Sequence, residues 1–207
     1  MPRPVLITAG ATRNPIDSMR SITSNSSGAT GVYISQRLYV NERTVTLMGS
    51  NVALLQPECP TNSIEFTSTR DLFAKMNAWV VEHPTGIVVH AAAVGDFEVP
   101  NTTSGKIASG SVLTLELQPT PKIVDEIKRW SPDVYLVSFK AAAPDTSLES
   151  LELIARKQLQ RTNSDLVFGN ILGNLNKDVM LMSTDSTQVF TNRQDGLDAL
   201  VDRILQW

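Results

Sequence analysis

The 207-residue chain has few of the side chains that build disulfides, zinc cages or histidine relays. Its single cysteine, Cys59, excludes an internal disulfide and a cysteine-rich zinc site, and we expect an ordinary loop thiol there. Only two histidines occur. His90 ends an apolar run and is expected to be a hydrogen-bonded core residue, whereas His83, beside Pro84, is expected in a turn.

Positive charge and long apolar runs are also scarce. The formal net charge of -3 argues against a general nucleic-acid binder, although it allows a local basic pocket for a small anion. No stretch approaches the roughly 20 apolar residues of a membrane helix, and the apolar run at residues 5–8 is too short for a signal peptide. A hydrophobic content of 42% is typical of a globular protein. We therefore expect a cytoplasmic protein with no membrane or nucleic-acid partner.

Short β-branched runs alternate with amphipathic patterns along the chain, which predicts an α/β fold. We expect one domain over residues 1–207, with a Rossmann-like, mostly parallel sheet and helices on both faces. The almost wholly apolar segment 86–93 predicts a strand that is buried on both sides. Strands are expected at residues 5–8, 44–48, 63–67, 86–93, 134–139, 165–171, 179–183 and 188–191, and helices at 28–39, 69–81, 121–130, 148–161 and 195–207.

Several local features refine this prediction. Ser68 is expected to cap the helix at 69–81, and Thr146 with Glu149 matches a capping box for the helix at 148–161. The last two strands are expected to form an antiparallel hairpin at one sheet edge. Residues 96–118 are expected to form a flap, with a polar loop at 96–110 and an extended arm at 112–117.

In open α/β sheets the ligand lies beyond the carboxyl ends of the strands, where the chain carries unusual segments. Gly10, Ala11 and Thr12 follow the first strand, at the place of a glycine-rich nucleotide turn. Neither the G-x-G-x-x-G fingerprint nor a P-loop is present, so a plain connecting loop is an equal alternative. The run 24–28, Ser-Asn-Ser-Ser-Gly, opens the next helix with hydroxyls and free N–H groups, which favours anion binding. The alternative is that one of these serines only caps the helix.

Two further segments follow later strands. Ala92 and Ala93 would let a base or ribose approach the backbone. Asp96 offers a carboxylate for Mg²⁺, or is a strand-end acid that faces water. Lys106 lies in the polar loop, where it would neutralise charge on a transferring phosphate, or is simply a solvated lysine.

The motifs occur in a recognisable order: residues 7–20 (ITAGATRNPIDSMR), residues 26–28 (SSG), residues 91–97 (AAAVGDF) with Gly105-Lys106-Ile107, residues 113–121 (LTLELQPTP), residues 138–140 (SFK) and residues 165–170. Together they resemble phosphopantothenoylcysteine synthetase, also called phosphopantothenate–cysteine ligase. This family occurs alone or as the C-terminal half of a bifunctional coenzyme A biosynthesis flavoprotein. The resemblance runs from Val5 to about Asn170.

The resemblance implies a two-step ligation with Mg²⁺ and either CTP or ATP. The nucleotide activates the carboxylate of 4'-phosphopantothenate as an acyl-nucleotide with release of pyrophosphate, and the amine of cysteine then forms the amide. Known members are dimers, so a homodimer is implied, with the arm at 112–117 as the partner contact.

Site residues follow from the same resemblance. Lys106 would stabilise the first transfer, Arg20 would place the acyl intermediate, and Asp96 would hold Mg²⁺ or the ribose. The implied nucleotide- and phosphate-binding residues are Gly10, Ala11, Thr12, Ser26, Ser27, Gly28, Ala92, Ala93, Asp96, Phe97 and Phe139.

One position separates this chain from the family pattern. The family asparagine that orients the acyl-nucleotide stands four residues after the equivalent of Arg20, where this chain has Ser24 followed by Asn25. Either Asn25 takes over that role, or the chain is a catalytically impaired homologue that only binds nucleotide. A short-chain NADP-dependent oxidoreductase is a third alternative, although the chain lacks its G-x-G-x-x-G turn and any Tyr-x-x-x-Lys pair.

Overall fold

The computed structural model describes residues 2–57, 62–174 and 176–207, so the prediction for Cys59 lies outside the described residues. The main sheet is built from β1 (Val5–Ala9), β4 (Val45–Gly49), β5 (Ser63–Glu65), β6 (Ile87–His90), β9 (Tyr135–Ala142), β10 (Leu166–Ile171), β11 (Val179–Met182) and β12 (Thr187–Phe190). These described strands form an eight-stranded sheet in the order β12-β11-β10-β9-β6-β1-β4-β5. Neighbouring strands are parallel from β10 through β9, β6, β1 and β4 to β5. Strands β11 and β12 add an antiparallel edge. The predicted Rossmann-like fold and its edge hairpin are confirmed.

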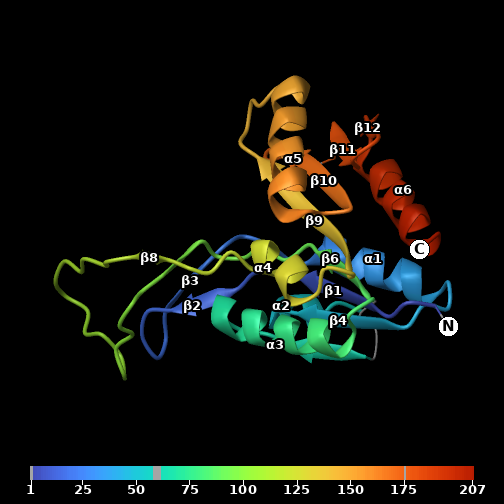
Figure 1. Ribbon diagram of the computed structural model, residues 1–207. Coiled ribbons are helices and arrows are strands. Elements are labelled where there is room, and N and C mark those ends of the chain that lie inside the picture. Colours follow the sequence, from blue (N-terminus) through green and yellow to red (C-terminus); the bar gives the residue numbers. More distant parts are fainter. Residues whose placement is uncertain (1, 58–61, 175) are drawn as a thin grey trace.

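Helices cover both faces of the sheet (Figure 1). The main helices are α1 (Ala29–Tyr39), α3 (Thr69–Glu82), α4 (Ile123–Trp130), α5 (Leu148–Thr162) and α6 (Arg193–Leu205), and the short α2 (Asn51–Leu54) follows β4. Helices α1 and α6 share one core layer, and α3 and α4 share the other. In β6, Ile87 and Val89 face the α1–α6 layer, whereas Val88 faces the α3–α4 layer. This alternation explains why the strand is apolar throughout.

The helix caps show one confirmed prediction and one wrong one. Ser68 caps α3, since its Oγ accepts a hydrogen bond from the N–H of Asp71 at 3.2 Å. The cap of α5 is Ser147, whose Oγ accepts from the N–H of Ser150. Thr146 instead donates its hydroxyl to the carbonyl of Ala143 at 2.7 Å, so the capping box of Thr146 with Glu149 is wrong.

The flap (residues 96–118) projects beyond the sheet on the side of a small hairpin (Figure 1). Strands β7 (Phe97–Glu98) and β8 (Gln118–Pro119) pair at its base. Glu98 forms an ion pair with Arg70 of α3 and accepts from the Gln118 amide, which fixes that base. The extended arm at 112–117 is exposed and irregular, because no described strand pairs with it.

The hairpin beside the flap is β2 (Arg13–Pro15) with β3 (Ser21–Thr23), inserted between β1 and α1. It was not predicted from the sequence, since its strands are three residues long and carry no alternating apolar pattern. Within the described part of the chain, no helix has the length and apolar character needed to cross a membrane.

Candidate functional site

The sheet order creates a crevice between β1 and β6. Successive connections run outward from these two strands in opposite directions, so the loops after them part and leave a ligand site at their carboxyl ends. The two loops are held together by backbone hydrogen bonds. Ala93 N–H donates to the carbonyl of Gly10 at 2.8 Å, and Thr12 N–H donates to the carbonyl of Ala93 at 3.2 Å.

A cavity of about 320 Å³ opens at this crevice, and we name it the carboxyl-edge cavity. It brings together three segments that the sequence singled out separately: the start of α1, the alanines after β6, and Phe139 of β9. Its lining residues are Asn25, Ser26, Ser27, Gly28, Ala29, Thr30, Ala91, Ala92, Ala93, Phe139, Ala141, Asn170 and Arg193.

Glycines allow the start of α1 to approach β1 this closely. Gly10 and Gly28 both have a positive φ, of 88° and 81°. A Cβ on Gly28 would lie 2.7 Å from the backbone nitrogen of Gly10, and one on Gly31 would lie 2.6 Å from the Cβ of Ala9. In G-x-G-x-x-G, the first glycine permits a tight turn, the second lets the backbone approach the ligand, and the third lets the helix pack closely on the strand. Here two segments separated by the β2–β3 hairpin supply them, which is why the contiguous fingerprint is absent.

The N-terminus of α1 begins at the N-cap Gly28, which has no side chain to cap the helix. Ser27 Oγ accepts a hydrogen bond from the N–H of Ala29 at 3.4 Å, so one serine of the run does satisfy a first-turn N–H, as the alternative expected. That one bond does not account for the remaining N–H groups of the first turn. First-turn N–H groups point out of the helix end, and this end lines the carboxyl-edge cavity. Free donors and the helix dipole both favour an anion there.

Some of the implied binding residues do not line the carboxyl-edge cavity, namely Gly10, Ala11, Thr12, Asp96 and Phe97. The Thr12 side chain is fully buried, and its Oγ1 accepts hydrogen bonds from Gly95 N–H at 2.8 Å and from the Thr69 hydroxyl at 3.1 Å. Ala11 is also buried and forms an isolated bridge with Ala93. Phe97 is half exposed in β7 and does not line the carboxyl-edge cavity. Thr12 and Ala11 are therefore buried residues that hold the loop after β1 against the loop after β6.

A second cavity, of about 220 Å³, shares Ala92, Phe139 and Ala141 with the first, so Phe139 borders both. It is bordered by His90, Asp96, Lys122 and Lys140, among others. Asp96 is more than half exposed and forms an ion pair with Lys122 at 2.6 Å. The two cavities therefore adjoin at Phe139, whose ring also stacks on the Phe168 ring with the centroids 5.0 Å apart.

His90 is buried, as expected, and its Nδ1 lies 3.0 Å from the Thr8 hydroxyl. Thr8 Oγ1 also accepts from the N–H of Ala92, so its proton is free to bond to the imidazole. Burial lowers the pKa of His90 to about 4, because the charged form loses its solvation. The imidazole is therefore neutral at physiological pH.

The flap is fastened to the β2–β3 hairpin by backbone hydrogen bonds, from Ser18 N–H to the Gly105 carbonyl and from Thr103 N–H to the Ile16 carbonyl, and by one buried carboxylate. The Asp17 side chain has no solvent exposure. Its oxygens accept from the N–H groups of Ile107, Met19 and Arg20 at 2.7–3.0 Å, and from the Arg20 guanidinium at 2.8 Å. The hydrogen bonds from the N–H groups of Ile107 and Met19, with further help from Arg20, hold the pKa of Asp17 at about 2.

Lys106 is not brought to either cavity. It is exposed on the flap, next to Ile107, and is absent from the residues that line the two spaces. Arg20, in the turn between β2 and β3, donates to the carbonyl of Ile107 in the flap at 3.2 Å. Ser24 is exposed and also lies outside both linings, whereas its neighbour Asn25 lines the carboxyl-edge cavity.

Two polar lining residues were missed by the sequence interpretation. Asn170 is buried near the end of β10, where the rule that ligands lie beyond strand carboxyl ends would have found it. Arg193 opens α6 and reaches the cavity from the end of the chain. Nothing in its sequence neighbourhood signals this placement.

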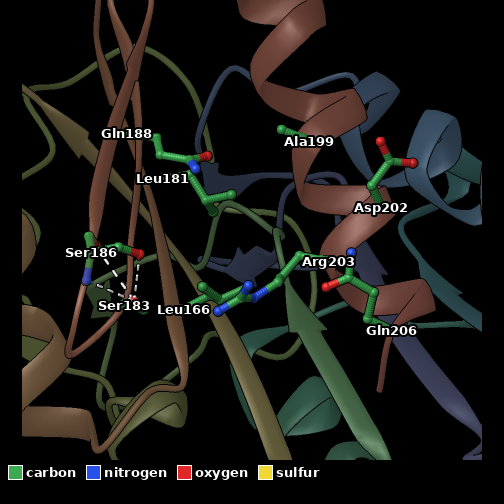
Figure 2. A pocket seen from close by; sticks show the side chains of 9 residues that line it. All are labelled: Leu166, Leu181, Ser183, Ser186, Gln188, Ala199, Asp202, Arg203 and Gln206. Atoms are coloured by element: carbon green, nitrogen blue, oxygen red, sulfur yellow. Dashed lines mark hydrogen bonds between the residues drawn. The ribbon is translucent and has the colours of Figure 1, made fainter.

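A further cavity, of about 220 Å³, lies between α6 and the β11–β12 hairpin (Figure 2). It includes Leu166, the first residue of β10, and so lies at the opposite edge of the sheet from the crevice. Arg203 is accompanied there by Asp202, and Ser183 bonds to Ser186. No helix N-terminus and no glycine turn is among the described residues that line it, so the chemistry of phosphate binding points to the carboxyl edge instead.

These features define a Rossmann-like α/β protein. The helix N-terminus in its carboxyl-edge cavity, where the strand order reverses between β1 and β6, favours an anion. The chain belongs to the family described as DNA/pantothenate metabolism flavoprotein C-terminal domain, which matches residues 2–202. It is 42% identical over 186 residues to the coenzyme A biosynthesis bifunctional protein CoaBC of Thermococcus kodakarensis, a match that covers 87% of this chain and 45% of that protein. The CoaBC of Bacillus subtilis is 32% identical over 167 residues, which cover 80% of this chain and 39% of the relative. The chain thus spans less than half the length of these relatives.

Solved structures agree with this assignment. The DNA/pantothenate metabolism flavoprotein of Streptococcus pneumoniae aligns with a TM-score of 0.86 and 27% identity over 99% of both chains. A Cab2 variant in complex with phosphopantothenate-cysteine aligns with a TM-score of 0.77 and 20% identity, over 99% of this chain and 88% of that one. At that identity the second likeness shows the fold alone.

Proposed function

We propose that this chain is a phosphopantothenate–cysteine ligase that uses CTP or ATP in coenzyme A biosynthesis. The observation that carries the proposal is the carboxyl-edge cavity, where a helix N-terminus whose N-cap is glycine, close glycines and an aromatic wall converge. Family membership supplies the reaction class. The first listed relatives are about twice as long, and we assign to this chain only the ligase half-reactions.

In the proposed reaction the phosphates occupy the start of α1, near Ser26, Ser27 and the Gly10 turn. Free N–H groups of the first helical turn offset the negative charge that gathers when a triphosphate meets a carboxylate. The base packs against Phe139, and Ala92 and Ala93 leave room for the ribose. The substrate carboxylate attacks the α-phosphorus, pyrophosphate leaves, and the cysteine amine later displaces the nucleoside monophosphate.

Lys106 would act on the phosphates from a flap that carries it outside both cavities. Two copies of the chain would resolve this separation if the flap of one reaches the cavity of the other. The exposed apolar side chains of the arm support such a homodimer, since Val112 is 96% exposed and Leu113, Leu115 and Leu117 are also exposed. We further propose a cytoplasmic location, consistent with this pathway.

The described residues could hold magnesium only as an ion that is bound mainly by the nucleotide and by water. The described residues hold no group of three or more side chains that would cage a metal ion, and Asp96 shares its carboxylate with Lys122. Mg²⁺ that is bound mainly by nucleotide phosphates and water needs one or two protein carboxylates, and Asp96 provides one. Such an ion would neutralise phosphate charge.

Asn25 is proposed to orient the acyl-nucleotide in place of the family asparagine, because it lines the cavity and Ser24 does not. The alternative, an impaired homologue that binds nucleotide without ligation, rests on Ser24 alone.

The test combines the purified chain with 4'-phosphopantothenate, Mg²⁺, and CTP or ATP, with and without cysteine. The proposal predicts pyrophosphate release and, with cysteine, the amide product by mass spectrometry. Nucleotide binding without pyrophosphate release would instead identify the impaired homologue.

Lys106→Ala should lower pyrophosphate release by about 10²-fold or more while the melting temperature stays unchanged, because the side chain is exposed. Lys177→Ala, at an exposed lysine between β10 and β11, is the matched control. Equal rates in the two variants would remove Lys106 from the mechanism.

A further inference from the structure

Arg193 is the one ionisable side chain among the described residues that line the carboxyl-edge cavity, and no acid lines that cavity. Its Nη2 donates to the Thr30 hydroxyl at 3.1 Å, within the first turn of α1. Its Nη1 is buried and has no hydrogen-bond partner among the described residues. A buried guanidinium nitrogen without a partner is costly, because nothing replaces its lost hydration.

The surroundings of Arg193 offset this cost only in part. Its guanidinium lies over the Phe168 ring at 5.3 Å, a favourable cation–π contact, but burial still lowers the Arg193 pKa from its usual value. Its bond to Thr30 holds the positive charge beside the N-terminus of α1, where the helix dipole is itself positive. Asp198, an acid one turn further along α6, is already bonded to the Tyr33 hydroxyl. No described acid forms an ion pair with Arg193.

We propose that Arg193 is a phosphate receptor of the carboxyl-edge cavity, acting with the first-turn N–H groups of α1. An entering phosphate would pair with both the guanidinium and the helix end. It would give the unpartnered nitrogen an acceptor, and its negative charge would offset the repulsion between the guanidinium and the helix dipole. The inference deepens the proposed ligase function and rests on it for the identity of the ligands. Their shared chemistry is a phosphate group, which either the nucleotide or 4'-phosphopantothenate supplies.

The experiment measures dissociation constants by calorimetry for wild type, Arg193→Gln and Arg203→Gln. Arg203 is the matched control, since it lies on the same helix but borders the cavity of Figure 2. The ligands are CTP, ATP, 4'-phosphopantothenate, and pantothenate, which lacks the phosphate. Arg193→Gln should weaken binding of the contacted phosphate ligand at least tenfold, and Arg193→Lys should recover part of it. Arg203→Gln should bind like wild type.

The ligand arms identify the source of the phosphate. A loss confined to CTP and ATP assigns Arg193 to the polyphosphate, and a loss confined to 4'-phosphopantothenate assigns it to that substrate. An unchanged affinity for every phosphate ligand overturns the proposal. An equal loss for pantothenate also overturns it, because a residue that only holds the structure would affect both compounds.

Inorganic pyrophosphate separates failure of this inference from failure of the proposed function. If the chain catalyses no ligation but pyrophosphate raises the melting temperature of wild type and not of Arg193→Gln, the receptor stands and the ligase does not. If pyrophosphate and the other phosphate ligands leave wild-type melting unchanged, the receptor is refuted. Without ligand, Arg193→Gln should melt no lower than wild type, since it removes a buried charge.

Discussion

Single residues at the switch point determine how closely two backbones approach. At Gly28 a positive φ coincides with a lack of space, whereas at Gly173 a similar φ of 82° has open surroundings. The pair therefore separates the cost of backbone strain from the cost of a steric clash, which matters because the cavity depends on the approach of α1 to β1.

Gly28→Ala should lower the free energy of unfolding by about 2–4 kcal/mol, since strain and overpacking both act. Gly173→Ala should cost only about 1 kcal/mol, from strain alone. Urea denaturation of both variants measures the difference. A similar loss in the two would show that the Gly28 contact with Gly10 is not limiting.

Asn25→Ala should slow amide formation about ten- to hundredfold and leave acyl-nucleotide formation nearly unchanged, because the side chain is proposed to act only in the second step. Rapid-quench measurement of the two steps provides the readout. Ser24→Ala, beside it but outside the cavity lining, is the control. A larger effect at Ser24 would reverse the assignment of the two residues.

At the scale of elements, the flap depends on its contact with the β2–β3 hairpin. Ile107 N–H donates to Asp17 one residue from Lys106, so Asp17 fixes the backbone beside that lysine. The carboxylate also organises the hairpin turn through Met19 and Arg20. One side chain thus fixes two segments that are far apart in the sequence.

Asp17→Asn should speed hydrogen exchange at the Ile107 amide and reduce the rate of pyrophosphate release about tenfold, because a neutral amide is a weaker acceptor for four donors. Exchange followed by mass spectrometry, together with steady-state kinetics, tests this. Glu152→Gln on α5, which loses a surface ion pair with Arg156, should change neither. Unaltered exchange in the flap would contradict the proposed anchoring role.

The strands and helices could be predicted because burial imposes a regular spacing of apolar residues on helices and an apolar composition on central strands. The apolar run ending at His90 identified β6, and the hydroxyl of Ser68 identified a helix start. Thr146 and Ser147 have the same chemistry, however, and only the backbone conformation decides which one caps α5. The β2–β3 hairpin was missed because its hydrogen bonds, rather than its side-chain pattern, define it.

At the scale of the whole molecule, the site was only partly predictable. The start of α1 and the alanines after β6 lie beside Phe139, as the motifs implied. Arg193 was missed, since α6 returns to α1 only through the complete order of the sheet. The family resemblance assigns Lys106 to the nucleotide site, yet in one chain the lysine lies outside the cavity. The proposed site therefore includes the flap of a second copy.

Stability should depend on pH through His90. Its pKa is about 4 in the fold against about 6.5 unfolded, so the unfolded state takes up a proton first as the pH falls. The His90 contribution is complete above pH 6.5 and declines by about 3 kcal/mol between pH 6.5 and 4. Loss from Asp17 follows only below about pH 4, and continues to about pH 2.

Denaturation curves across this range should have a smaller slope in His90→Gln than in wild type. His83→Gln, which removes the other histidine, is the matched control variant. An equal slope in wild type and His90→Gln would show that the buried imidazole is not the titrating group.

A crystal structure with a non-hydrolysable CTP or ATP analogue tests the central claim most directly. The account predicts phosphate density at the first turn of α1, within reach of Ser26, Ser27 and Arg193, with the base against Phe139. Density in the cavity between α6 and the β11–β12 hairpin, with the start of α1 left empty, would contradict it.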